Sequence, residues 1–134
     1  YAALGLTLRS HPVALLRAQL APRRVLTAAQ MADFATGRLV RACGIVTMRQ
    51  RPQTANGVVF VTLEDETGSV NVIVWKSIKE RFRQVVYQSR LMAVYGTWQR
   101  DDDSGGQVRH VIAGHLVDLT PLLGNLATSS RDFH

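Results

Sequence analysis

Residues 57–75 constrain the fold of this chain more than any other stretch. Two runs rich in β-branched and aromatic residues, 58–63 and 70–75, suit the pleated surface of a sheet. The acidic segment between them, Glu64-Asp-Glu-Thr-Gly68, has the composition of a turn. The pattern therefore predicts a β-hairpin.

The two faces of this hairpin differ in character. Side chains alternate along a strand, so Phe60 lies on the opposite face from Val59 and Val61. One face suits a hydrophobic core, and the other presents Phe60, Thr62, Asn71 and Ile73 to a partner. Such a face suits a flat ligand that can stack on an aromatic ring.

Composition allows one small domain and favours a polyanionic partner. The 134 residues are 46% hydrophobic, which is enough for a single core. The formal net charge is +6 and the sequence pI about 10.4, which favours nucleic acid over a role of the charge in solubility alone. Cys43 is the single cysteine, which excludes an internal disulfide and favours a reducing compartment. No apolar run approaches the length of a membrane span, and we expect a cytoplasmic protein.

The first third of the chain has helical patterns. Ser10 is the expected cap of a helix with Pro12 in its first turn, and Thr27-Ala-Ala-Gln30 is a capping box for a second helix that runs to Phe34. The chain begins without methionine inside an apolar segment, which indicates a piece of a longer protein. We interpret residues 1–37 as a helical linker, or the end of a preceding domain, docked onto the domain that begins at residue 38.

Strand patterns begin at residue 38. A long first strand, 39–51, contains Gly44, where it can bend and serve two sheet edges. After the hairpin, Ser77-Ile-Lys-Glu80 forms a capping box for one amphipathic helix over 76–88. Two further strands, 91–99 and 108–119, complete the order β-β-β-α-β-β.

This order is that of an OB-fold: an all-β class, five-stranded Greek-key barrel with a helix between strands 3 and 4. We expect the barrel over 38–120 and a flexible C-terminal tail over 121–134. The loops 50–56 and 100–107 then occupy the positions that flank the ligand groove of the fold. The fold alone leaves the ligand open.

Several segments resemble one polymerase family. Residues 57–75 are similar to the OB hairpin of bacterial C-family replicative polymerases, and more broadly to the anticodon-binding domain of aspartyl-type tRNA synthetases. Leu4-Gly-Leu-Thr-Leu-Arg-Ser-His-Pro12 resembles the segment that precedes this domain in the polymerases. Three further segments are most similar to the error-prone, ImuC-type branch: Thr47-Met-Arg-Gln-Arg-Pro52, Ala113-Gly-His-Leu-Val-Asp118 and Ser130-Arg-Asp-Phe-His134.

The resemblance implies a role outside catalysis for this chain. The parent of such a domain is a DNA-directed DNA polymerase that uses magnesium and copies damaged template in translesion synthesis, and it works in the bacterial cytoplasm with an ImuB-like accessory subunit. No carboxylate motif for two metal ions is evident here. We therefore expect no catalytic residue, metal or cofactor in this chain, and a monomer in isolation.

The resemblance also suggests binding residues. Phe60 corresponds to the aromatic on which a base stacks in the synthetase domains, and Asn71 to a polar reader of base edges. Two cations that leave strand 1, Arg49 and Arg51, suit phosphate contacts beside this face, and Arg41, Lys76 and Arg109 extend the basic edge. The alternatives stay open: Phe60 as a residue that caps the barrel, and the arginines as solvated strand ends.

Other conspicuous residues have simpler interpretations. Trp75 and Trp98 are expected in the core at the barrel rim, and Asp101-Asp-Asp103 in a mobile turn instead of a metal site. His110 and His115 are expected on opposite faces of a regular strand, without metal-ligand spacing. In the tail, Arg131 and Phe133 suit the pocket of a protein partner.

Two functions compete. The first is a module that binds single-stranded template DNA beside a polymerase active site. The second is a protein-interaction module that docks the ImuB-like subunit and touches DNA little. Exposed aromatics and arginines serve both kinds of interface, so the sequence leaves both open.

Overall fold

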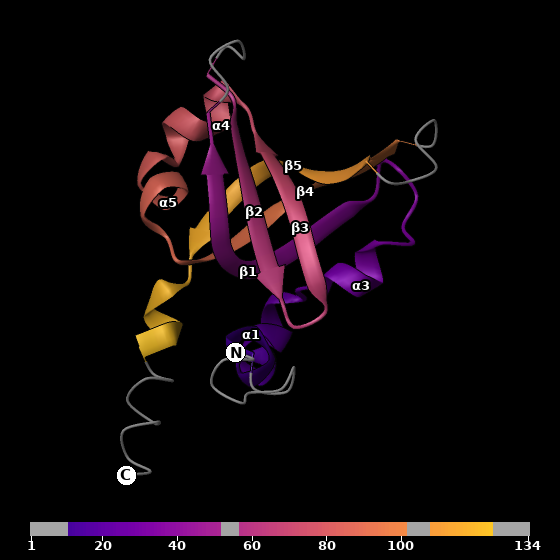
Figure 1. The fold of residues 1–134 in the computed structure, drawn as a ribbon, viewed down its shortest axis with the longest axis vertical. Helices are drawn as coiled ribbons and strands as arrows, with labels where there is room; N and C mark the ends of the chain where they lie inside the picture. The colour runs from indigo at the N-terminus through magenta and orange to yellow at the C-terminus, as the bar shows by residue number, and fades with distance from the viewer. Residues whose placement is uncertain (1–10, 52–56, 102–107, 125–134) are drawn as a thin grey trace.

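The computed structural model describes residues 11–51, 57–101 and 108–124 (Figure 1). Five strands close into a barrel in the order β1-β2-β3-β5-β4, and all neighbours are antiparallel except β3 and β5. The strands are β1 (Leu39–Gln50), β2 (Val59–Asp65), β3 (Gly68–Val74), β4 (Leu91–Asp101) and β5 (Val108–Asp118). The predicted OB-fold barrel is confirmed. The acidic turn after Asp101 and residues 125–134 of the predicted tail lie outside the described residues. The first residues of that tail, predicted flexible from residue 121, are instead helical to residue 124, and Leu122 and Leu123 pack against a hydrophobic cluster.

Strand β1 bends so that it closes the barrel. Its first half, Leu39 to Ile45, pairs with β4, and its second half pairs with β2. Gly44 lies at the crossover, where a Cβ atom would come within 2.9 Å of the Cβ of Leu63. The predicted bend at Gly44 is therefore confirmed, and only glycine allows so close an approach.

A bulge interrupts β1 just after the bend. The register passes from Val46 opposite Leu63 to Met48 opposite Thr62, so Thr47 has no opposite residue. One extra residue reverses the alternation of side chains beyond it. The residues of β1 after Thr47 therefore face the other way from what regular alternation predicts.

Two short helices cover one end of the barrel, α4 (Lys76–Arg81) and α5 (Arg83–Gln88). One continuous helix capped by Ser77 was predicted, and this was wrong: Trp75 holds the N-cap position, and the helix breaks at Phe82, with φ −117° and ψ 36°. The break lets side chains of both helices meet the barrel core, namely Ile78, Phe82, Val85 and Val86. Among the described residues, no helix is long and apolar enough to cross a membrane.

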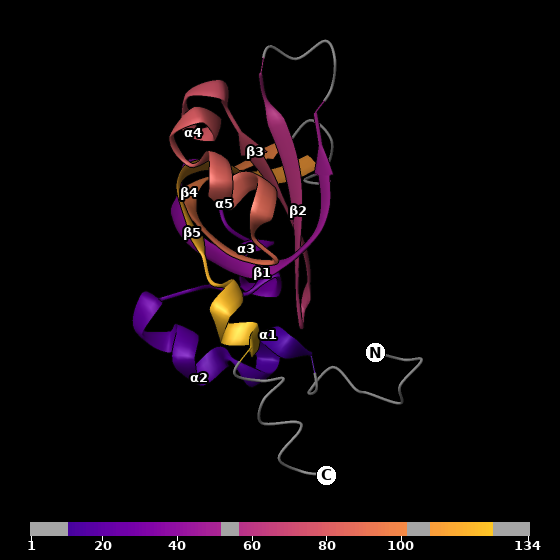
Figure 2. The ribbon, with the colours of Figure 1, turned by 90° about the vertical axis from the view of Figure 1, so that its left-hand side faces the viewer.

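A helical segment lies beneath the barrel and forms a second core with it (Figure 2). It consists of α1 (Pro12–Leu15), α2 (Arg17–Leu20) and the 3-10 turn η3 (Ala21–Arg23). Fully buried side chains of this segment pack against the outside of β1 and β4: Val13, Leu16 and Leu20 against Cys43, Leu91 and Ala93. His11 caps α1, because its Nδ1 accepts a hydrogen bond from the Val13 amide at 3.1 Å. The predicted cap, Ser10, lies outside the described residues.

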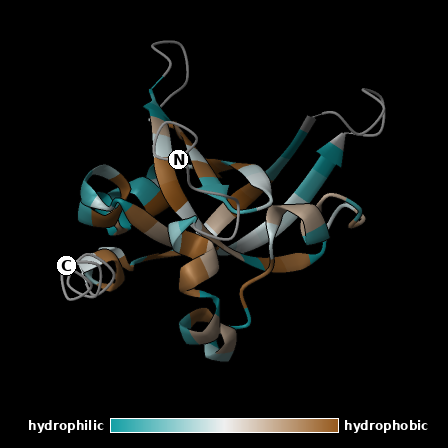
Figure 3. Cartoon of the chain, turned by 60° about the horizontal axis from the view of Figure 1, so that its bottom comes forward, coloured by the Kyte–Doolittle hydropathy of each residue, from teal (hydrophilic) through white to brown (hydrophobic). Residues whose placement is uncertain are grey.

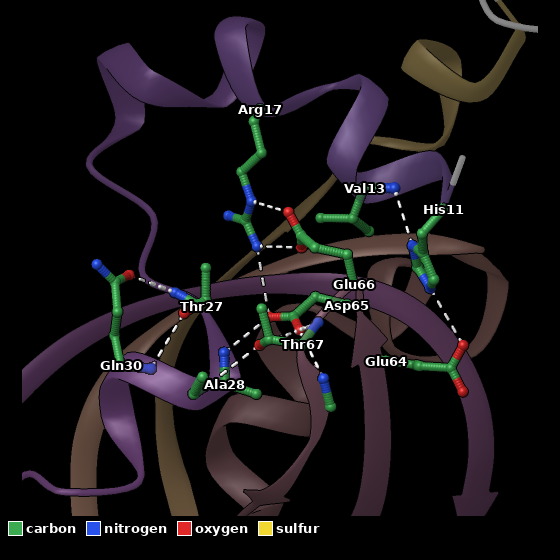
Figure 4. A network of polar contacts seen from close by, with 12 residues as sticks. His11, Val13, Arg17, Thr27, Ala28, Gln30, Glu64, Asp65, Glu66 and Thr67 are labelled. Atoms are coloured by element: carbon green, nitrogen blue, oxygen red, sulfur yellow. Dashed lines mark hydrogen bonds and ion pairs between the residues drawn. The ribbon is translucent and has the colours of Figure 1, made fainter. Parts of the chain in front are cut away.

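The second predicted capping box is confirmed in α3 (Ala28–Met31). The Thr27 hydroxyl accepts from the Gln30 amide at 3.0 Å, and the Gln30 side chain accepts from the Thr27 amide at 2.8 Å. The helix ends at Met31, one turn before the predicted end at Phe34. The first turn of α3 lies on the β2–β3 turn, because the amides of Ala28 and Ala29 donate to the side chains of Asp65 and Thr67 (Figure 4).

Asp65 organises that turn. Its buried carboxylate accepts hydrogen bonds from the amides of Thr67 and Gly68, and from the amide of Ala28 in α3. Arg17 donates two hydrogen bonds to Glu66, at 2.7 and 2.6 Å, and His11 contacts Glu64 at 3.1 Å (Figure 4). The acidic turn, which the sequence indicates only as a loop, thus joins the helical segment to the hairpin.

Candidate nucleic-acid interface

The outer face of the hairpin carries a hollow of about 430 Å³, here called the hairpin groove. Cross-strand pairs build it: Phe60 lies opposite Ile73, and Thr62 opposite Asn71. Strand β1 adds a third column, because Gln50 lies opposite Phe60 and Met48 opposite Thr62. The groove therefore spans three neighbouring strands. Phe60 is 37% exposed and Met48 is 49% exposed, so both can contact a ligand.

Strand β5 closes the groove with Arg109 and His110. Arg109 is exposed, and its Nη1 donates to the Ala32 carbonyl at 3.4 Å. His110 contacts the Gln99 side chain at 2.9 Å, and burial lowers its pKa, which keeps the imidazole neutral at neutral pH. No aspartate or glutamate lies among the described residues that line the groove. The charge of the groove is thus positive.

The structure brings together five of the predicted binding residues: Phe60, Thr62, Asn71, Ile73 and Arg109. The Thr62 hydroxyl donates to the Asn71 side-chain oxygen at 3.4 Å. This contact uses the oxygen of the amide, so the NH₂ group of Asn71 is the donor that it can offer to a base edge.

Arg49 and Arg51, predicted to contact phosphate beside the aromatic face, do not line the hairpin groove. Arg49 lies opposite Val61, a core residue, whereas Phe60 pairs with Gln50. The cause is the bulge at Thr47, which reverses the phase of β1 and turns the arginines away from the groove. Regular alternation along β1 would place Arg49 and Arg51 on the groove side, and Met48 and Gln50 lie there instead.

The two arginines instead face helix α5. Arg49 donates from Nε to the Val86 carbonyl at 2.6 Å and from Nη2 to the Ser89 carbonyl, and partial burial lowers its pKa. The Arg51 guanidinium lies 5.6 Å from the centre of the Tyr87 ring. These contacts give Arg49 a structural role at the end of α5, where free carbonyl groups need donors.

The other two predicted cations lie outside the groove. The Arg41 guanidinium lies 4.9 Å from the Tyr95 ring centre, and its Nη1 donates to the Arg23 carbonyl at 3.0 Å. Lys76 begins α4 and packs across Gly57, whose φ of +74° and lack of a side chain make room for it. Lys76 is exposed near the end of the hairpin, and Arg41 belongs to a second hollow on the barrel.

Trp75 is a surface residue that the sequence interpretation placed in the core. It is 53% exposed, whereas Trp98 is 4% exposed and donates from its indole to the Phe34 carbonyl at 3.1 Å, as a core residue should. Extended backbone at Trp75 continues the alternation of Asn71 and Ile73, which places Trp75 on the outer side of the barrel with them, although it does not line the groove. Alternation along β3 was the signal that could have found it.

A second bulge corrects the interpretation of the histidines. In β5, His115 lies opposite Tyr95 and Ala113 opposite Gly96, so Gly114 is the extra residue. His110 and His115 therefore both lie outside the barrel, while Ala113 and Leu116 are buried. Figure 3 shows that hydrophobic and hydrophilic residues both occur along the strands. Within 11–51, 57–101 and 108–124, no three His, Cys, Asp or Glu side chains gather to hold a metal ion, and the carboxylates do not form a two-metal site. Arg131 and Phe133 lie outside these ranges.

A closed five-stranded barrel in this strand order, with a groove on β2 and β3, is the architecture of the OB-fold class of binding domains. The sequence profile described as "OB-fold nucleic acid binding domain" matches residues 32–118. The chain belongs to this family.

Curated relatives place the whole chain within larger proteins. It is 59% identical over 134 residues to an error-prone DNA polymerase of Ralstonia pickettii, and 53% identical over 134 residues to one of Pseudomonas fluorescens. The matches cover 100% of the chain but only 12% and 13% of those polymerases. The resemblance to error-prone polymerases inferred from the sequence is confirmed.

A solved structure supports the fold. The crystal structure of asparaginyl-tRNA synthetase from Pyrococcus horikoshii superposes with a TM-score of 0.58 and 23% identity, over 71% of this chain and 23% of the synthetase. At this identity the likeness concerns the fold alone.

Proposed function

We propose that this chain is a non-catalytic module that binds single-stranded template DNA within an error-prone DNA polymerase during synthesis past damaged bases. The observation that carries the proposal is the exposed Phe60 ring in a groove that has one arginine and no described carboxylate. The polymerase names of its relatives support DNA over RNA as the ligand.

The groove offers each part of a nucleotide a partner. A base stacks on Phe60, and the neighbouring polar pair, Thr62 and Asn71, offers hydrogen bonds to its edge. Arg109 at the rim attracts the phosphate. Stacking tolerates every base, so we expect little sequence preference, as suits a polymerase that meets any template.

Replacement of Phe60 by alanine tests the proposal. Phe60→Ala should weaken binding of labelled oligo(dT) by about 1–3 kcal/mol through lost stacking, measured by fluorescence anisotropy. The slope of log K against log salt should change little, because no charge is lost. The melting temperature should also stay close to that of the wild type, because Phe60 is partly exposed and belongs to neither core cluster.

Leu15→Ala is the matched control. It also removes an exposed apolar side chain, 54% exposed, but from α1 beneath the barrel. It should leave the oligo(dT) affinity unchanged. Equal affinities of wild type and Phe60→Ala, with both folded, would refute DNA binding in the groove and leave it to a protein such as an ImuB-like subunit.

A further inference from the structure

A second hollow of about 810 Å³ lies on the barrel surface formed by β1, β4 and β5. Three arginines line it, Arg24, Arg38 and Arg41, and we call it the arginine groove. Leu39 is also part of it and is 79% exposed, the most exposed large apolar residue in the described chain. None of these groups takes part in the binding of a base by the hairpin groove.

The arginine groove is built for an anion. The Arg38 guanidinium lies 3.7 Å from the centre of the Phe34 ring, and Arg41 is held by the Tyr95 ring and the Arg23 carbonyl. Guanidinium groups fixed in this way lose little freedom when they bind a phosphate. No aspartate or glutamate occurs among the described residues that line the groove, so its cations are not neutralised from within.

The strand registers connect the two grooves. Phe60 pairs with Ile73, Ile73 with Ile112, Ile112 with Thr97, and Thr97 with Leu39. All five side chains are at least partly exposed, so they form one row around the outside of the barrel. Four steps between strands span about 19 Å at about 4.8 Å each. The row begins in the hairpin groove and ends in the arginine groove.

We propose that a single DNA strand bound in the hairpin groove continues along this row and that its phosphates bind in the arginine groove. The proposal rests on the proposed function and extends the binding surface beyond the β2–β3 face. The interior of the row is apolar or weakly polar, Ile73, Ile112 and Thr97, which suits sugars and bases between two cationic ends.

The ring contacts indicate what the arginine groove recognises. Tyr95 is covered by Arg41 and stacks on His115, with ring centres 5.6 Å apart and an interplanar angle of 22°. The Tyr95 ring is therefore already engaged by two neighbours, and the arginines are the groups that the groove offers to a strand. The groove binds the backbone of the strand, through charge, and adds affinity without sequence preference.

The length of the oligonucleotide tests this path. Binding of oligo(dT) of about 4, 8, 12 and 16 nucleotides, the range of site sizes of OB-folds, should be measured for the wild type and for Arg24→Gln/Arg38→Gln. The variant should bind the shortest oligonucleotide as the wild type does and should lose affinity only for the long ones. For the long ones its slope of log K against log salt should be flatter by about 1.4, since each phosphate contact contributes about 0.7.

Arg81→Gln/Arg83→Gln is the matched control, because it removes the same charge from helices α4 and α5. It should bind every length as the wild type does, and circular dichroism should show that both variants are folded. Equal losses in both variants would assign the effect to net charge and overturn the proposal. If the wild type binds the longer oligonucleotides no more tightly than the shortest one, the proposed path is overturned. DNA binding in the hairpin groove would then still stand. If the wild type binds none of the oligonucleotides, the proposed function fails, and this path with it.

Discussion

Arg49 stabilises the fold, whereas the sequence suggested that it binds phosphate. Its guanidinium donates to the Val86 and Ser89 carbonyls and ties β1 to the end of α5. Arg49→Ala should lower the free energy of unfolding by about 1–2 kcal/mol, because hydrogen bonds from a charged group are lost from a partly exposed site. Urea denaturation measures this change, and oligo(dT) affinity should not change.

The neighbouring arginine is the control for that measurement. Arg51 lies on the same face and contacts the Tyr87 ring at 5.6 Å. Its replacement by alanine should cost less than about 1 kcal/mol, as for an exposed cation–π contact. A loss of DNA affinity without a loss of stability in Arg49→Ala would restore the phosphate role expected from the sequence.

Trp75 provides a spectroscopic test of the outer face of the hairpin. The chain has two tryptophans, and Trp98 is buried. Acrylamide should therefore quench mainly the Trp75 emission, and bound oligo(dT) should quench it as well if the DNA passes over this face. In Trp75→Phe both effects should nearly vanish. Quenching by DNA that persists in Trp75→Phe would place the ligand near Trp98 and contradict the assignment.

At the residue scale, the bulge in β1 explains which candidate binding residues the sequence placed correctly and which it did not. Alternation along the hairpin predicts Phe60, Thr62, Asn71 and Ile73 on one face, and the structure gathers them. Alternation along β1 fails, because the bulge at Thr47 leaves no signal in its own residues. A bulge is set by the pairing of two strands, and a single sequence does not contain that information.

Among the elements, the β2–β3 turn joins the helical segment to the hairpin through side-chain contacts. Arg17 holds Glu66 with two hydrogen bonds, and this contact lowers the pKa of Glu66 below its ordinary value of 4.5. A lowered pKa in the folded state stabilises the protein above pH 4.5, and this stabilisation is lost as the pH falls through the pKa of the folded protein. The joint between the helical segment and the hairpin should therefore weaken in acid.

Arg17→Gln tests this joint. It should lower the free energy of unfolding at neutral pH by about 1–2 kcal/mol, and its stability should fall less steeply than that of the wild type below pH 4.5. Arg83→Gln, an exposed arginine on α5, should follow the wild type at every pH. Parallel stability curves for Arg17→Gln and the wild type would show that Glu66 does not couple stability to pH.

Capping patterns in the sequence predicted one helix start correctly and another wrongly, because the second depends on contacts with the rest of the fold. The capping box at Thr27 involves residues three apart, and both of its hydrogen bonds form as expected. The capping box at Ser77 fails, because the chain enters α4 directly from β3 and Trp75 takes the cap position. The break at Phe82 accompanies the packing of Ile78, Phe82 and Val85 against the barrel core, and no helical pattern in residues 76–88 indicates it.

At the scale of the whole molecule, the order of the five strands and the one helix expected between strands 3 and 4 were enough to predict the barrel. The second core was not predictable, because it requires knowledge of which outer face of β1 and β4 stays uncovered. The apolar residues Val13, Leu16 and Leu20 cover that face and bury Cys43. The matched family profile starts only at residue 32, so this cover lies before the part that the family shares.

Removal of the cover gives the final prediction. A chain that starts at residue 38 keeps all five strands, but it loses α3 with its buried Met31 from the barrel core and exposes Cys43, Leu91 and Ala93. It should be less stable than the full chain and prone to associate through this apolar face. Its melting temperature and its sedimentation should both show the change.

The reactivity of Cys43 measures how well the outer face of β1 and β4 is covered, because Cys43 is the single cysteine in the chain. Burial raises the pKa of its thiol to about 12, so it should react with a disulfide reagent slowly at about pH 8 in the full chain and rapidly in the shortened one. Leu16→Ala in the full chain keeps the segment but loosens its packing, and should give an intermediate rate with a loss of about 2–5 kcal/mol. If the shortened chain is as stable and as unreactive as the full one, the segment is a linker that rests on the barrel. If it is less stable and more reactive, residues 11–37 form one folded unit with the barrel, to which Arg17 and Ala28 are joined through Asp65.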